Sequence, residues 1–124
     1  MSDAGYLAHL YQTRDEFRSN ADQAIVAGEL RKASELLWGA VTQQLKALAA
    51  TRNVLITSHR EFFDFLRQCS KELHETQLYA DFVSLNALHR NFYDETIPPD
   101  AFPEFYDKAI QFIGRLDELV KTLK

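Results

Sequence analysis

The apolar residues of segment 30–50 recur at the spacing of an α-helix. A stripe of this kind predicts a helix that packs against others along one face. The stripe comprises Leu30, Leu37, Val41, Leu45 and Leu48. Small residues beside it would let neighbouring helices approach closely, and these are Ala33, Gly39, Ala40 and Ala47. We therefore expect residues 30–50 to form the central helix, around which the rest of the chain packs.

Similar patterns predict four more helices. Gly28 fits the C′ position that ends the first of them. Residues 53–57 (NVLIT) are expected to form a buried connection after the central helix. Ser58 and Glu61 have the spacing of a capping box, which starts the next helix. All three prolines lie between Asp94 and Pro103, where they must interrupt a helix. The expected bounds are residues 3–27, 30–52, 58–73, 76–93 and 102–122.

These elements predict an all-α fold in one domain over residues 1–124. The length of 124 residues fits one domain, and a hydrophobic fraction of 46% is enough for a core. The short turn at Gly28 should make the first two helices antiparallel. In the last helix, Phe105, Ala109, Phe112 and Leu116 repeat at the spacing of a bundle seam. We expect an antiparallel up-and-down bundle of four to five helices.

Composition narrows the class of protein. The formal net charge of -4 argues against a strongly basic nucleic-acid binder. With Cys69 as its single cysteine, the chain can form neither an internal disulfide nor a cysteine-rich zinc site. The sequence shows no leader and no apolar run of about 18 residues, so we expect a cytoplasmic protein without membrane contact.

Several common catalytic patterns are missing from the sequence. No histidine has a glutamate three residues before it, which argues against a di-iron bundle. The four glycines are scattered, so no phosphate-binding loop is present. No serine lies in a Gly-x-Ser-x-Gly elbow. We therefore expect no metal and no cofactor, and we assign no catalytic residue.

One candidate for chemistry joins Arg52 to His59 across the connection between two helices. Arginine holds phosphate groups, and histidine moves protons near neutral pH. Together they would suit RNA cleavage, in which the 2′-hydroxyl attacks the adjacent phosphate. The alternative is structural, with Arg52 capping one helix and His59 starting the next. The sequence alone leaves both interpretations open, with the structural one favoured.

A second candidate lies near the end of the fourth expected helix. Helical periodicity places Asn86, Arg90 and Tyr93 on one side, as a candidate contact for a ligand or partner. His89 falls on the apolar stripe that ends at Phe92. We therefore expect a largely buried, structural His89 that is hydrogen-bonded to a backbone group or a carboxylate. In the structural interpretation Arg90 pairs with the acid four residues later.

Three segments resemble a known superfamily. They are GELRKASELLWGAVTQQLKALA, TSHREFFDFL and ALHRNFYDE. The first is similar to a helix signature with Glu-x-x-Trp-Gly-Ala, and the last to a Leu-His-x-Asn-Phe-Tyr signature. The sequence thereby resembles the HEPN superfamily (higher eukaryotes and prokaryotes nucleotide-binding), in particular its small stand-alone PaREP-type members.

The resemblance implies an all-α bundle, often dimeric, that acts near nucleic acids or nucleotides. Some members are metal-independent ribonucleases of toxin–antitoxin or defence systems, and others accompany a minimal nucleotidyltransferase. The ribonucleases carry an arginine a few residues before a histidine, late in the chain. Here Arg52 and His59 come too early and His89 precedes Arg90, so we transfer no ribonuclease residue to this chain.

The expected function is a non-catalytic, homodimeric HEPN-like module that binds RNA, a nucleotide or a partner nucleotidyltransferase. One alternative is a metal-independent endoribonuclease that uses histidine and arginine. Another is a structural scaffold without a ligand. The acidic net charge favours a protein partner. A basic cleft shared by Arg52, His59, Arg60 and Arg90 would favour RNA.

Overall fold

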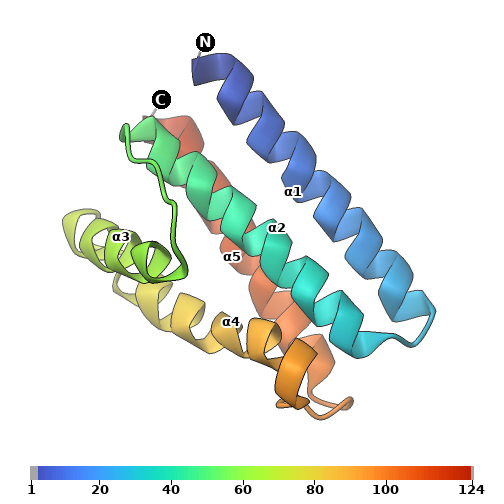
Figure 1. The fold of residues 1–124 in the computed structure, drawn as a ribbon. Helices are drawn as coiled ribbons and strands as arrows, with labels where there is room; N and C mark the ends of the chain where they lie inside the picture. Colours follow the sequence, from blue (N-terminus) through green and yellow to red (C-terminus); the bar gives the residue numbers. More distant parts are fainter. Residues whose placement is uncertain (1–2, 124) are drawn as a thin grey trace.

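The structure is a computed structural model that describes residues 3–123 (Figure 1). Within that range all regular secondary structure is helical. The expectation of an all-α fold is thus confirmed, and the helix bounds lie close to the expected ones. The helices are α1 (Asp3–Val26), α2 (Leu30–Thr51), α3 (His59–Glu72), α4 (Thr76–Asp94) and α5 (Phe102–Leu123).

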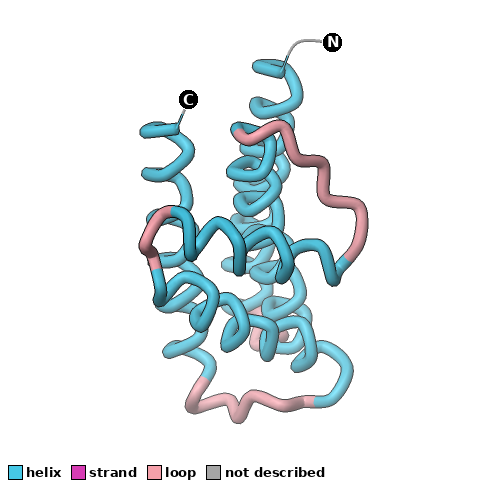
Figure 2. Tube along the Cα trace, turned by 90° about the vertical axis from the view of Figure 1, so that its left-hand side faces the viewer, coloured by secondary structure: helices cyan, strands magenta, loops and turns pink. Residues whose placement is uncertain are grey.

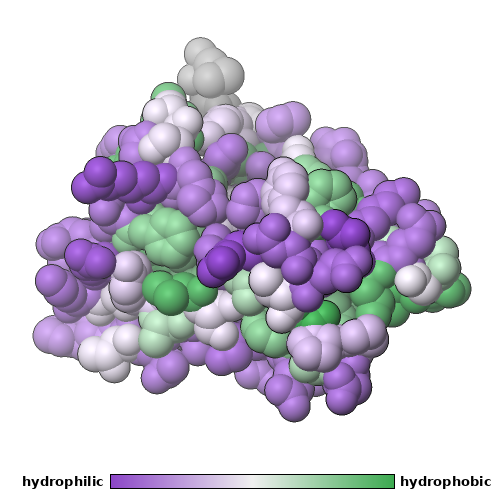
Figure 3. All heavy atoms as spheres, turned by 60° about the horizontal axis from the view of Figure 1, so that its bottom comes forward, coloured by the Kyte–Doolittle hydropathy of each residue, from purple (hydrophilic) through white to green (hydrophobic). Residues whose placement is uncertain are grey.

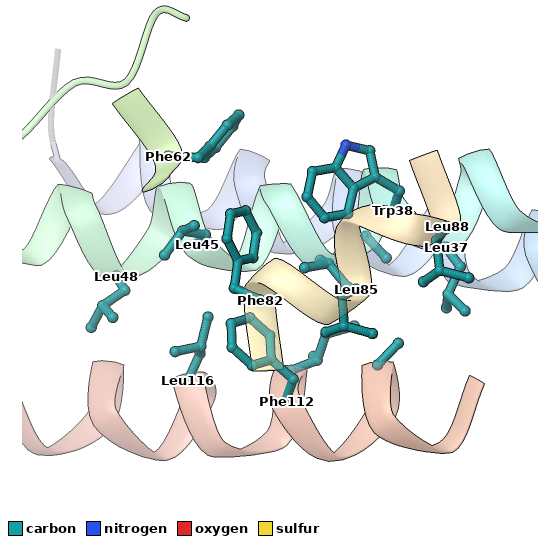
Figure 4. Close-up of a cluster of buried hydrophobic side chains, with 14 of the residues drawn as sticks. Leu37, Trp38, Leu45, Leu48, Phe62, Phe82, Leu85, Leu88, Phe112 and Leu116 are labelled. Atoms are coloured by element: carbon teal, nitrogen blue, oxygen red, sulfur yellow. The ribbon is translucent and has the colours of Figure 1, made fainter. Parts of the chain in front are cut away.

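Helix α2 is central, as its apolar stripe predicts. It contacts each of the other helices. Leu37, Val41 and Leu45 on this helix are completely buried. Phe82 of α4 and Phe112 of α5 stack beside it, with ring centroids 5.9 Å apart, and Figure 4 shows these side chains converging on α2. The core therefore lies where α2, α4 and α5 meet.

The helices do not form a single up-and-down bundle. Helices α1, α2 and α5 lie along one direction, and α2 and α5 run the same way (Figure 1). Helices α3 and α4 form a hairpin that packs across α2 and α5, on the side away from α1, as Figure 2 shows from the side. The expected bundle topology is therefore replaced by a three-helix layer crossed by a helical hairpin.

The cause is the connection between α2 and α3. It runs back along α2 instead of turning at its end, so α3 begins beside the middle of α2 (Figures 1 and 2). We expected this segment to be buried, and that expectation is wrong. Val54 is 41% exposed and Leu55 is 66% exposed, whereas Ile56 alone of the three is buried, at 5%. A segment that returns over the surface has one side facing solvent, so only some of its side chains can be buried.

The start of α3 confirms the expected cap. The Ser58 hydroxyl accepts a hydrogen bond of 3.3 Å from the backbone N–H of Glu61. The Glu61 carboxylate reaches one residue further back than a capping box requires. It accepts from the backbone N–H of Thr57 at 3.2 Å and from its hydroxyl at 2.7 Å. Both partners fix the end of the returning connection, and with it the position of His59.

Helices α1 and α5 are joined by two reciprocal hydrogen bonds. The Tyr11 hydroxyl on α1 donates to Asp117 on α5 at 2.7 Å. The Tyr106 hydroxyl on α5 donates to Asp22 on α1 at 2.8 Å. Because the two helices are antiparallel, each tyrosine near the start of one helix meets an aspartate near the end of the other. Sequence periodicity did not point to these pairs.

The Tyr11 pair predicts a loss of stability at high pH. Burial, followed by the hydrogen bond to Asp117 and the charge of that carboxylate, raises the pKa of Tyr11 from 10.0 to about 12. Between these values the unfolded chain loses the phenolic proton while the folded protein keeps it, so stability falls as pH rises. Urea unfolding measured across this range should show the fall in the parent protein and a smaller one in Tyr11→Phe. Identical pH profiles would contradict the assignment.

A second prediction concerns the crossing of α1 and α2 at Gly39. A Cβ atom added there would lie 3.0 Å from the ring of Phe17 on α1. Gly39→Leu should therefore overpack the crossing and lower the unfolding free energy by about 1–3 kcal/mol. Gly114→Ala is the control, because a Cβ there meets nothing within 4 Å. Gly114→Ala should stabilise its helix by about 0.5–1 kcal/mol. Urea unfolding measures both variants, and a Gly39→Leu protein more stable than the parent would show that the crossing has room for a side chain.

Candidate functional site

The candidate site lies along the antiparallel contact between α2 and α4. Residues on α2 meet residues progressively earlier on α4, about one helical turn at a time. Trp38 stacks on Phe82 at the inner end, with ring centroids 5.0 Å apart. Further out the contacts are Glu35 with His89, and then Arg31 with the backbone carbonyls of Phe92 and Tyr93. The contact therefore leads from the core to the surface.

Glu35 fixes the orientation of His89. The Nδ1 atom of His89 lies 2.9 and 3.0 Å from the two carboxylate oxygens of Glu35. Because an ionised carboxylate only accepts hydrogen bonds, Nδ1 is the donor. In the neutral ring this leaves Nε2 with a free lone pair. The two side chains are 33% and 30% exposed, so the pair can be reached from solvent.

A second histidine lies beside the first. His59, the first residue of α3, has its ring centroid 5.3 Å from that of His89 and 5.8 Å from that of Trp38. His59 is exposed, and within the described residues its ring nitrogens have no hydrogen-bond partner. Tyr93 meets the His89 ring edge-on at 5.5 Å. We call Glu35, Trp38, His59, His89 and Tyr93 the histidine cluster.

Arg52 lies outside this cluster. It forms an ion pair with Glu72, and its Nη1 lies 3.7 Å from Sγ of Cys69, near the end of α3. His59 is at the other end of that helix, on the order of 15 Å away at 1.5 Å per residue. The sequence pattern suggested a joint Arg52–His59 site, and the returning connection separates the two. Arg52 is the C-cap residue of α2, as its structural interpretation predicts. Its side chain also ties this end of α2 to α3 through Glu72.

The expected group on α4 is brought together only in part. Tyr93 joins the histidine cluster, whereas no hydrogen bond, ion pair or ring contact joins the side chains of Asn86 and Arg90 to it in the described structure. Arg90 is exposed, and its side chain forms no ion pair or hydrogen bond with any residue from 3 to 123, so the expected pair with Asp94 is not formed. Asn86 is half-buried, and its Oδ1 atom has no hydrogen-bond partner in the described part of the chain.

His89 is half-buried instead of largely buried as we expected, and its expected carboxylate partner is present. The buried face of α4 passes through Leu88 and Asn91, at 0% and 2% exposure, instead of His89 and Phe92. Asn91 takes this place because its polar groups are satisfied there. Its Nδ2 donates to the Ser34 hydroxyl at 2.9 Å, and its Oδ1 accepts from the backbone N–H of Ile97 at 2.8 Å.

Sequence reasoning missed Glu35 and Trp38 as members of the site. Neither residue belongs to the apolar stripe that predicts the central helix. The signal was present in the Glu-x-x-Trp-Gly-Ala segment, which carried the family resemblance. A spacing of three residues places the two side chains on one side of a helix.

The described residues offer no metal site. No three His, Cys, Asp or Glu side chains between residues 3 and 123 are grouped so that they could hold an ion. No helix in this range is long and apolar enough to cross a membrane. The chemistry of the site therefore rests on two imidazole rings, one carboxylate and the aromatic rings around them.

The fold and site define an all-α protein with a solvent-accessible pair of histidines. The archaeal PaREP1/PaREP8 family matches residues 8–113, which are most of the chain. The chain therefore belongs to this family, and the matched stretch contains the whole histidine cluster. The comparison with curated proteins and the comparison with solved structures each gave no match.

Proposed function

We propose that this protein is a HEPN-like module that binds RNA or a nucleotide at the histidine cluster. The observation that carries the proposal is the surface pair of His59 and His89, 5.3 Å apart, in which Glu35 orients one ring. Imidazole N–H groups donate hydrogen bonds to phosphate oxygens, strongly when the ring is protonated. The three segments that resemble HEPN proteins supply Glu35, His59 and His89 respectively, which supports the same assignment.

The surroundings of the pair also suit a phosphorylated ligand. Each histidine is followed by an arginine, Arg60 after His59 and Arg90 after His89. Arg60 has only a 3.7 Å contact with Asp64, with its own side chain 89% exposed. Such an exposed pair is worth little, so both guanidinium groups remain available for phosphate.

RNA cleavage at the same site is the second candidate. The Glu35-bound ring of His89 exposes Nε2, which can accept the proton of a 2′-hydroxyl as it attacks the adjacent phosphate. A protonated His59 can then donate its proton to the leaving 5′-oxygen. One proton is accepted and one is donated, so the step balances without a metal. The distance between the two rings favours this candidate over a purely passive site.

RNA binding and cleavage should both depend on the two histidines. We expect His59→Ala and His89→Ala to weaken binding of a fluorescent single-stranded RNA by roughly tenfold, because each removes a charge-assisted hydrogen bond. His74→Ala is the control, since His74 lies exposed in the turn before α4. Arg90→Ala should weaken binding and change stability by less than about 1 kcal/mol.

The same proteins separate the candidates. Cleavage that persists in EDTA and disappears in both histidine variants supports the ribonuclease. Binding without cleavage supports the module alone. If the parent protein neither binds nor cleaves RNA or nucleotides, the proposed function fails and a scaffold role replaces it.

We also propose a two-fold symmetric homodimer, with a nucleotidyltransferase as the protein partner that the HEPN resemblance implies. Two-fold dimers are the commonest homo-oligomers, and the exposed side chains of Val54 and Leu55 offer apolar surface. Sedimentation at micromolar concentration should show a dimer that Leu55→Ser weakens. A parent protein that sediments only as a monomer would remove the proposal.

A further inference from the structure

A cavity of about 840 Å³ lies next to the histidine cluster. Its walls come from the start of α2, the end of α4 and the proline-rich segment that follows. Ligand sites in proteins usually enclose roughly 300–1,000 Å³, so this cavity has the size of a small-molecule site. Residues that line the cavity include Arg31, Lys32, Phe92, Tyr93, Ile97 and Pro98.

The cavity and the histidine cluster are continuous on both helices. Tyr93 lines the cavity and also contacts the His89 ring at 5.5 Å. On α2, Arg31 lines the cavity one turn before Glu35, which binds His89. A turn of helix rises about 5.4 Å. A ligand with a phosphate at the histidines therefore brings its neighbouring group to the cavity.

The cavity is lined by exposed aromatic and apolar side chains. Tyr93 is 62% exposed and Phe92 is 38% exposed, with ring centroids 4.9 Å apart. Ile97 and Pro98 add apolar surface. Figure 3 shows the molecule from this end, where apolar patches lie among polar residues. Exposed aromatic rings of this kind are platforms on which nucleic-acid bases stack.

The charged side chains of the cavity are already paired. Arg31 donates to the carbonyl of Phe92 at 2.7 and 3.1 Å and to the Glu95 carboxylate at 3.0 Å. Lys32 lies 3.9 Å from Glu29. The pair of Lys32 and Glu29 is exposed and weak. Glu29 and Glu95 nevertheless line the cavity together with the two cations, so no net positive charge remains to attract a second phosphate. The cavity therefore suits a base or nucleoside better than a phosphate.

From this arrangement we infer that the cavity is a base-binding subsite and that the ligand is single-stranded RNA. One phosphate lies at the histidine cluster, and the adjacent base stacks on Tyr93. A base within a duplex is stacked and paired, so it cannot enter the cavity. The net charge of -4 also argues against an extended basic surface of the kind that holds duplexes. This inference rests on the proposed function.

The test compares three probes: a short fluorescent single-stranded RNA, the same strand annealed to its complement, and a mononucleotide. Tyr93→Ala should weaken binding of the single strand roughly tenfold, as expected for a lost base–aromatic stack. Tyr93→Phe keeps the ring and should bind like the parent. The Arg31 contacts to α4 use backbone carbonyls, so Tyr93→Ala keeps them. Val83→Ala is the matched control, since Val83 is 48% exposed on α4 and does not line the cavity.

Two further results support the inference: the single strand binds more tightly than the duplex and the mononucleotide, and the loss in Tyr93→Ala is small for the duplex, whose bases cannot enter the cavity. The inference is overturned if Tyr93→Ala binds the single strand like the parent while the histidine variants bind weakly, and the proposed function then survives. Equal affinity for duplex and single strand also overturns it. If the parent binds none of the probes, the proposed function itself fails.

Discussion

The enclosure of α2 is the constraint on which the rest of the structure depends. With α1, α5 and the α3–α4 hairpin all packed against it, nearly every side chain on α2 must find a partner inside the protein. Gly39 meets this demand by leaving room for the Phe17 ring. The polar residues meet it by pairing, because a buried polar group without a partner costs about 1–3 kcal/mol. Ser34, at 0% exposure, donates to the carbonyl of Leu30 at 2.8 Å and accepts from Asn91 at 2.9 Å. Gln44 meets the demand only in part: its Oε1 accepts from Arg14 at 2.7 Å, and its Nε2 has no partner among the described residues.

The same demand sets the register between α2 and α4. Ser34 binds the buried Asn91, and the next residue along, Glu35, binds His89. A shift of α4 by one turn along α2 would separate the buried Asn91 from Ser34, its partner on α2. The contact that stabilises the fold therefore also holds His89 with its Nε2 edge free. In this protein the geometry of the candidate site follows from a buried hydrogen bond on the neighbouring face of the helix.

Periodicity in the sequence was sufficient to locate the helices, since each has a clear apolar face or a clear stop signal such as Gly28. Topology depended on residues 52–58, whose length and apolar character fit either a buried crossing or a return over the surface. The connection returns over the surface, so Arg52 and His59 lie apart, and the sequence alone could not decide this. The rotation of α4 was misjudged because the expected apolar stripe ends at Phe92, whereas the buried face includes the polar Asn91. Its burial depends on Ser34 and on the backbone of Ile97, which lie far away or later in the chain, and no local pattern contains them.

Charge shows how such a site can hold RNA on an acidic protein. Glu35 carries a negative charge that offsets a protonated His89, so a phosphate meets a net attraction only when His59 is protonated or when Arg90 or Arg60 approaches. Long-range attraction of the RNA backbone is therefore weak, in contrast with proteins that release many counterions from a basic surface. Affinity must come from short-range contacts that depend on geometry, namely imidazole hydrogen bonds and base stacking. The proposed arrangement favours a strand whose bases are free over one whose only exposed feature is its phosphates.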